Sequence, residues 1–149
     1  MNPSPAGHEI GQRFRQLIDA LATGVLLQGE GTRILFSNAA ARDLLGLTED
    51  QLHGRSSFDP AWNVIHEDGS PFPGEEHPVP TALRTGRPVR SVVMGVWRPV
   101  TRDRVWLLVN AEPLTHSEGA SGPEVLCTFS DITSRPQVQE LARRGEERL

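Results

Sequence analysis

The sequence predicts an α+β domain, in which a five-stranded antiparallel sheet carries short helices on one face and a flanking helix at each end. Three observations predict this fold class. Segments with strand-like alternation occur twice near the N-terminus and three times in the C-terminal half. Helix caps and turn residues fill the region between them. Both ends have helical spacing, and 149 residues suffice for one domain with a core.

An amphipathic helix is expected over residues 9–22. This stripe of apolar residues precedes the first strand, so it either covers the domain's own sheet or meets a second copy of the chain. We expect a homodimer through this helix. The expected interface consists of Ile10, Phe14, Leu17 and Leu21, with Ile18 on the same face.

The first two strands are expected at residues 24–28 and 32–37, joined by a Gly-rich turn into a hairpin. Asn38 can then cap a helix over residues 39–45, because its side chain accepts hydrogen bonds from free N-terminal amides. Gly46 can end that helix in the left-handed conformation.

A second short helix is predicted by the capping-box spacing of Thr48 and Gln51. Residues 55–75 are rich in Pro, Gly and Asp and predict a loop. Order returns in a helix over residues 78–84, which Gly86 ends.

Three longer strands complete the sheet. Residues 89–98 and 104–114 alternate in apolar character and form an antiparallel hairpin through a short polar turn. Residues 125–130 form the fifth strand, and a polar helical segment follows. In that segment Val138 recurs with later apolar positions at coiled-coil spacing.

Composition excludes several classes of function. The net charge is −4, and the 15 basic residues, all arginine, are scattered, so the footprint of nucleic-acid binding is missing. No apolar run approaches the roughly 20 residues of a membrane span, and the N-terminus lacks a signal-peptide pattern. We therefore expect a cytoplasmic protein. The single cysteine, Cys127, excludes an intrachain disulfide and is expected to be buried.

No catalytic set is recognisable in the sequence. The chain has no nucleophile elbow, no P-loop lysine and no histidine spacing that would hold a metal ion. We expect a non-enzymatic domain without a metal site.

The order of elements, together with four stretches, resembles the PAS domain, a bacterial sensory module. The stretches are FRQLIDALATGVLLQ, ILFSNAAARDLLGLTEDQLHG, EDGSPFPGEEHPVPTALRTGRPV and FSDITSR. The third is similar to a PAS subgroup common in sensor histidine kinases and diguanylate cyclases. The resemblance covers roughly residues 12–135.

The resemblance implies a sensor that passes its signal through the last motif, Asp131, Ile132 and Thr133, to a C-terminal helix and a downstream effector domain. Short polar side chains such as Asp131 and Thr133 also suit a plain helix cap. We expect residues 1–23 to be a tail and amphipathic helix, residues 24–133 the sensor domain, and residues 134–149 the start of a signalling helix.

The resemblance also implies a pocket between the sheet and the helices. For a small-molecule ligand, the expected pocket residues are Trp62, His77, Arg90 and Asn110, although strand alternation would instead place Asn110 on the outer face. His77 is the one candidate for haem ligation, since some PAS oxygen sensors use a histidine in this region.

A flavin is the other cofactor that PAS relatives bind. Nothing in the chain matches the adduct-forming cysteine motif of light-sensing relatives, and Cys127 lies in the wrong element. Trp97 and Trp106 could stack on a non-covalent flavin. We expect no cofactor, and keep a haem or flavin sensor and a small ligand-binding enzyme as alternatives.

Overall fold

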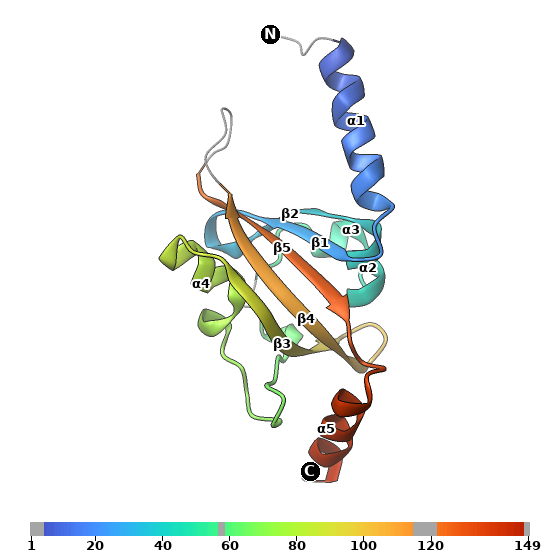
Figure 1. Ribbon diagram of the computed structural model, residues 1–149, viewed down its shortest axis with the longest axis vertical. Coiled ribbons are helices and arrows are strands. Elements are labelled where there is room, and N and C mark those ends of the chain that lie inside the picture. Colours follow the sequence, from blue (N-terminus) through green and yellow to red (C-terminus); the bar gives the residue numbers. More distant parts are fainter. Residues whose placement is uncertain (1–4, 57–58, 115–121, 148–149) are drawn as a thin grey trace.

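The computed structural model describes residues 5–56, 59–114 and 122–147. A single antiparallel sheet lies at the centre, and helices α1 (Pro5–Asp19) and α5 (Pro136–Glu147) extend from opposite ends of it (Figure 1). The α+β class and the five strands predicted from the sequence are confirmed.

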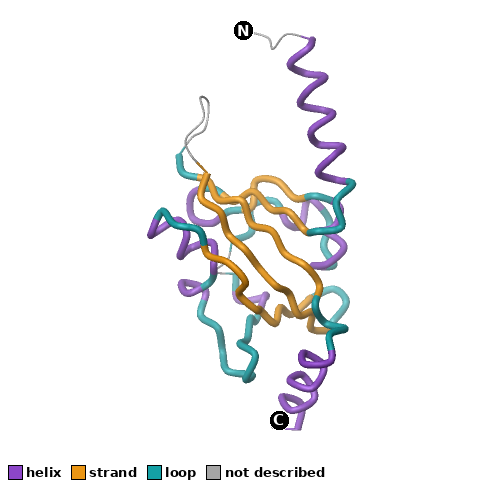
Figure 2. The backbone as a smooth tube through the Cα atoms, viewed as in Figure 1, coloured by secondary structure: helices purple, strands orange, loops and turns teal. Residues whose placement is uncertain are grey.

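The last strand of the chain lies in the middle of the sheet. It pairs on one side with the first strand, where Cys127 faces Leu26, and on the other with the long fourth strand, where Cys127 faces Ala111. The strands appear as one continuous sheet in Figure 2. Their spatial order is β2 (Ile34–Ser37), β1 (Gly24–Gln28), β5 (Glu124–Asp131), β4 (Asp103–Leu114) and β3 (Val89–Arg98).

Short helices between β2 and β3 form where the caps predict them. The Asn38 side chain accepts a hydrogen bond from the Ala41 amide at the start of α2 (Ala39–Leu45), and Gly46 ends the helix with a φ of +68°. Thr48 and Gln51 form a reciprocal capping box on α3 (Glu49–Leu52).

The helix α4 (Pro78–Thr85) packs against the sheet and helps to enclose the main core. This core fills the space between the inner face of the sheet and the helical region, because the inward residues of each strand are apolar. Alternation along β4 shows the division: Val105, Leu107 and Val109 face the main core. Trp106 and the half-buried Leu108 belong to a smaller cluster on the outer face.

Two boundaries differ from the prediction. The second strand begins at Ile34 instead of residue 32, because residues 30–32 form a turn of 3-10 helix with Gly31 and Thr32 both at positive φ. The N-terminal helix ends at Asp19, so Leu21 follows the helix and does not share its face.

Candidate functional site

A small cavity of about 80 Å³ lies between the inner face of the sheet and the helical region. Strands β1, β3, β4 and β5 supply one wall, and residues around α4 and the preceding loop supply the other. The walls are mainly apolar, and the larger side chains in them are Leu26, Trp62, Met94, Leu107 and Phe129. The polar residues in the lining are Gln28, Ser56, His77 and Cys127.

His77 lines the cavity, as expected, and is held rigidly there. It is 5% exposed, and its Nε2 lies 2.9 Å from the carbonyl oxygen of Phe72. Since a carbonyl only accepts, Nε2 carries the proton. The ring also meets the Phe72 ring edge-on with centroids 4.8 Å apart. Burial lowers the pKa of His77, so its imidazole is neutral at pH 7.

Trp62 also lines the cavity. Its indole N–H donates to the carbonyl of Ser56 at 3.0 Å, and the guanidinium of Arg55 lies 5.6 Å from the ring centroid. The short 3-10 helix that carries it, Pro60–Trp62, is capped by the Asp59 carboxylate. The ring is therefore fixed at both its polar edge and its face.

Arg90 and Asn110 do not line this cavity, and the expectation for these two residues is corrected. The Asn110 side chain accepts a hydrogen bond from the Ser91 amide at 2.9 Å, at a bulge where Ser91 has a φ of +59°. Arg90 is exposed and pairs with Glu112 at 3.3 Å. The alternation of β4 turns Asn110 and Glu112 away from the cavity-lining Val109.

The two tryptophans suggested for flavin stacking point away from the cavity as well. Trp106 is buried in the outer-face cluster, and Trp97 lies beside Arg104, whose guanidinium is 5.8 Å from its ring centroid. Cofactor-sized molecules need pockets of roughly 300 to 1,000 Å³. The residues present therefore do not fit a haem or a flavin in this cavity.

Cys127 is fully buried in the cavity wall. Burial without a nearby cation raises the pKa of its thiol to about 12, so the sulfur stays protonated. The residue behaves as a small apolar wall group.

The junction after β5 consists of Asp131, Ile132 and Thr133, and it is bonded to the middle of β4. The Ile132 amide donates to the carbonyl of Trp106 at 2.9 Å, and the Trp106 amide donates to the Thr133 hydroxyl at 2.9 Å. The Asp131 carboxylate accepts from the Thr133 amide at 2.8 Å. Both backbone groups of one β4 residue are thus held by the junction.

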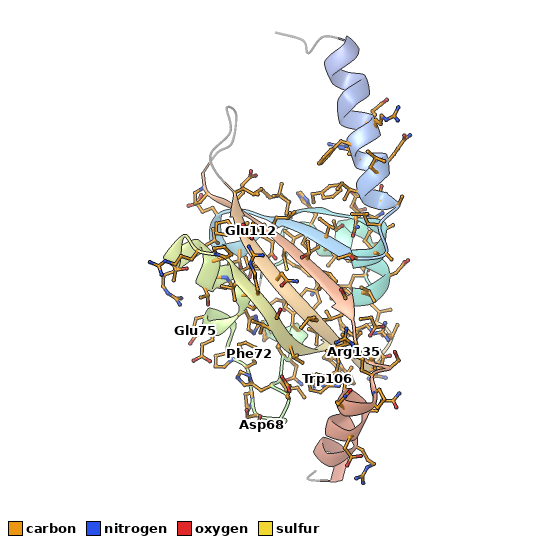
Figure 3. The ribbon with its side chains drawn as sticks, in the orientation of Figure 1. Asp68, Phe72, Glu75, Trp106, Glu112 and Arg135 are labelled. Atoms are coloured by element: carbon orange, nitrogen blue, oxygen red, sulfur yellow. The ribbon has the colours of Figure 1, made fainter. Side chains whose placement is uncertain are left out.

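The first turn of α5 folds onto the outer face of the sheet. Val138 is 6% exposed and packs with Trp106 and Ile132, and the half-buried Ile65, Val93 and Leu108 adjoin them. Figure 3 shows Trp106 next to the chain at Arg135, where α5 begins. Instead of lying on a coiled-coil seam, Val138 contacts the domain's own sheet.

The apolar stripe of α1 is uncovered within this chain. Phe14 is 63% exposed and Leu17 is 58% exposed, whereas Ile18 is half-buried. The Leu21 side chain is exposed beyond the helix end, and the Ile10 side chain lies outside the described residues. The helix does not cap its own sheet through this face.

Asn38 makes a second junction that the sequence pattern did not reveal beyond its role as a cap. The side chain is fully buried. Its amide donates to the carbonyls of Ile18 and Thr23 at 2.9 Å each, and its oxygen accepts from the amides of Val25 and Ala41 at 2.8 and 2.9 Å. One side chain therefore ties the end of α1 to β1 and α2.

Two further searches were negative within the described residues. No group of three or more His, Cys, Asp or Glu side chains gathers where a metal ion could be held. No helix in the described part of the chain has the length and apolar character needed to cross a membrane.

Residues 12–132 match the family model described as the PAS fold. An RNA-binding light-oxygen-voltage receptor superposes with a TM-score of 0.68 at 12% identity, covering 99% of this chain and 40% of that one. A PAS domain from Colwellia psychrerythraea gives 0.62 at 18% identity, covering 85% and 99%. A PAS domain of a two-component sensor histidine kinase gives 0.59 at 15% identity, covering 83% and 98%.

No curated protein sequence matches the chain. At these identities the structural likeness establishes the fold alone. The family match extends from within α1 to the middle of the junction and spans most of the 149 residues. The chain belongs to the PAS-fold family.

Proposed function

We propose that the chain is a non-catalytic sensing and dimerisation module of a signal-transduction protein. In this proposal a change at the cavity moves the sheet, and the motion passes through Asp131, Ile132 and Thr133 to α5 and a downstream effector domain. The observation that carries it is the pair of hydrogen bonds that fixes the junction to Trp106 in β4. PAS domains of a sensor histidine kinase and of a light receptor share the fold.

The cavity and the junction are neighbours along one strand. Leu107 lines the cavity, and in the sheet it pairs with Asp131. Trp106, the preceding residue, supplies both backbone groups that hold the junction. A displacement of Leu107 by a ligand would therefore reach the junction through a single peptide unit.

Packing of α5 supports the same route. Val138 is buried against Trp106, so the direction in which the helix leaves the domain depends on where that ring lies. Because packed clusters shift between discrete arrangements rather than deforming continuously, a small strand movement can redirect the helix.

Replacement of Thr133 by Val tests this coupling. The variant removes the hydroxyl that accepts from the Trp106 amide at 2.9 Å and keeps a branched side chain. A hydrogen bond worth about 1 to 1.5 kcal/mol corresponds to roughly tenfold in local opening. We expect the Val138 and Gln139 amides, which bond to the Arg135 carbonyl, to exchange about tenfold faster with deuterium.

The Gly86 amide, bonded to Ala82 at the end of α4, is the internal control and should be unaffected. Equal exchange of the α5 amides in both proteins would contradict a role of the junction in holding the helix.

A homodimer is proposed through the exposed α1 stripe, since Phe14 and Leu17 are large, apolar and uncovered. Light scattering at micromolar concentration should give about twice the chain mass of 16.4 kDa. The double variant Phe14→Glu/Leu17→Glu should be monomeric. Gln16→Glu adds a charge to the same helix outside the stripe and should remain dimeric. A wild-type monomer would contradict the dimer proposal.

The alternative proposals, a haem or flavin sensor and a small ligand-binding enzyme, predict different properties of the purified protein. An ultraviolet-visible spectrum distinguishes the cofactor sensor, since either group absorbs visible light. We expect only the tryptophan band near 280 nm. A visible band that remains after gel filtration would favour the cofactor sensor.

A further inference from the structure

We propose that the cavity beneath the sheet binds a small, uncharged, apolar molecule no larger than benzene. The inference rests on the proposed sensor function, because it names the class of ligand that this sensor would detect. Three features of the cavity carry it: its volume, the absence of charge among its lining residues, and the complete hydrogen bonding of its polar groups.

Volume sets the upper size of the ligand. The cavity measures about 80 Å³. An engineered apolar cavity of about 150 Å³ in another protein stays dry and binds benzene or xenon. A space of this order accepts one small molecule and excludes nucleotides, sugars and porphyrins, unless the core around it is repacked.

Charge excludes most common metabolites. No Asp, Glu or Arg is among the residues that line the cavity. A carboxylate, phosphate or ammonium group would lose its hydration there without gaining an ion-pair partner, which costs several kcal/mol or more. The cavity therefore discriminates against anions and cations alike.

The polar groups in the wall are already engaged. The Gln28 amide donates to the Thr32 carbonyl at 2.7 Å, and His77 donates to the Phe72 carbonyl at 2.9 Å. Among the described residues, no buried side-chain nitrogen or oxygen lacks a hydrogen-bond partner. The wall thus presents no unsatisfied side-chain polar group to a ligand or to a trapped water, which favours an apolar occupant.

Sulfur and aromatic groups complete the wall. Met94 and Cys127 present polarisable sulfur atoms, and Trp62 and Phe129 present ring carbons. Such groups gain dispersion energy against any close-fitting apolar atom. Binding is expected to depend on fit rather than on a specific hydrogen bond.

The test uses the 149-residue chain with benzene as the neutral probe and benzoate as the charged probe. A ligand that binds only the folded state raises the melting temperature by mass action. We expect benzene at about ten times its Kd to raise it by roughly 3 to 6 °C, and benzoate at equal concentration to leave it unchanged. Equal effects of the two probes, or no effect of either, would overturn the proposal.

Matched variants locate the binding site. Val109→Leu adds a methylene group to the cavity wall, and Val93→Leu makes the same change on the outer face of the sheet. Titrations followed by backbone amide shifts in NMR should show at least tenfold weaker benzene binding for Val109→Leu and unchanged binding for Val93→Leu. If Val109→Leu does not fold, Val96→Leu in the same wall replaces it. Unchanged affinity in the cavity variant would overturn the assignment.

The two proposals fail in distinguishable ways. Benzene binding that leaves the exchange of the α5 amides unchanged would support the ligand class and contradict transmission through Thr133. Absence of benzene binding would overturn the ligand class, whereas the Thr133→Val exchange experiment could still support the sensor.

Discussion

Replacement of Asn38 by Ala tests whether one buried side chain joins the N-terminal helix to the sheet. The variant leaves the Val25 and Ala41 amides and the Ile18 and Thr23 carbonyls without their partner. The Val25 and Ala41 bonds are buried, so water does not readily replace the lost oxygen there. The other two bonds are partly buried, and water can take over some of their role.

The magnitude follows from these four bonds. Loss of an N-cap costs about 1 kcal/mol, and a buried amide left unpaired costs about 1 to 3 kcal/mol. With a smaller contribution from the two carbonyls, Asn38→Ala should lower the free energy of unfolding by about 3 kcal/mol. At an m-value of about 2 kcal/mol/M, the urea midpoint falls by about 1.5 M.

Thr48→Ala is the matched control, because it removes only the exposed cap of α3. It should cost about 1 kcal/mol. Urea unfolding followed by tryptophan fluorescence and circular dichroism measures both variants. If the two losses agree within about 0.5 kcal/mol, the bonds of Asn38 to α1 and β1 contribute nothing to stability, and the reasoning is refuted.

Three further predictions concern buried groups. Because burial lowers the pKa of His77 below its ordinary 6.5, the unfolded chain takes up a proton first; stability should fall as the pH drops below about 6.5, and the difference from His77→Gln should vanish above it. Cys127, whose pKa is raised to about 12, should react with an aromatic disulfide reagent only in denaturant, and rapid labelling of the folded protein at pH 8 would contradict its burial. Gly95→Ala would place a Cβ 2.9 Å from the Ile65 and Trp106 side chains and should destabilise the domain by about 1 to 3 kcal/mol in urea unfolding, whereas a neutral effect would show that the outer-face cluster is loosely packed.

Local signals in the sequence predicted most of the fold. Helix caps at Asn38 and Thr48 and the glycine at position 46 act within a few residues of themselves, so their effect can be read without knowing the rest of the chain. Strand alternation likewise assigned each residue of β4 to one face, including the outward position of Asn110 that was kept as the alternative.

The pocket could be predicted only in part. Trp62 and His77 line the cavity, but Arg90 and Asn110 were expected there because they are polar and lie near it in the chain. A bulge at Ser91 and the pairing of Arg90 with Glu112 direct these groups elsewhere. Sequence spacing does not show such a bulge, since it arises from pairing between strands.

Sequence alone determined the order of the elements, the apolar faces of the strands, the exposed stripe of α1 and the absence of lysine and of a second cysteine. The tertiary structure decided that Val138 folds onto the sheet, that Asn38 reaches Ile18, and that the cavity is small and without charge. The physical reason is range. Caps and alternation depend on neighbours in the chain, whereas a cavity is the volume left over after side chains from distant segments have packed together.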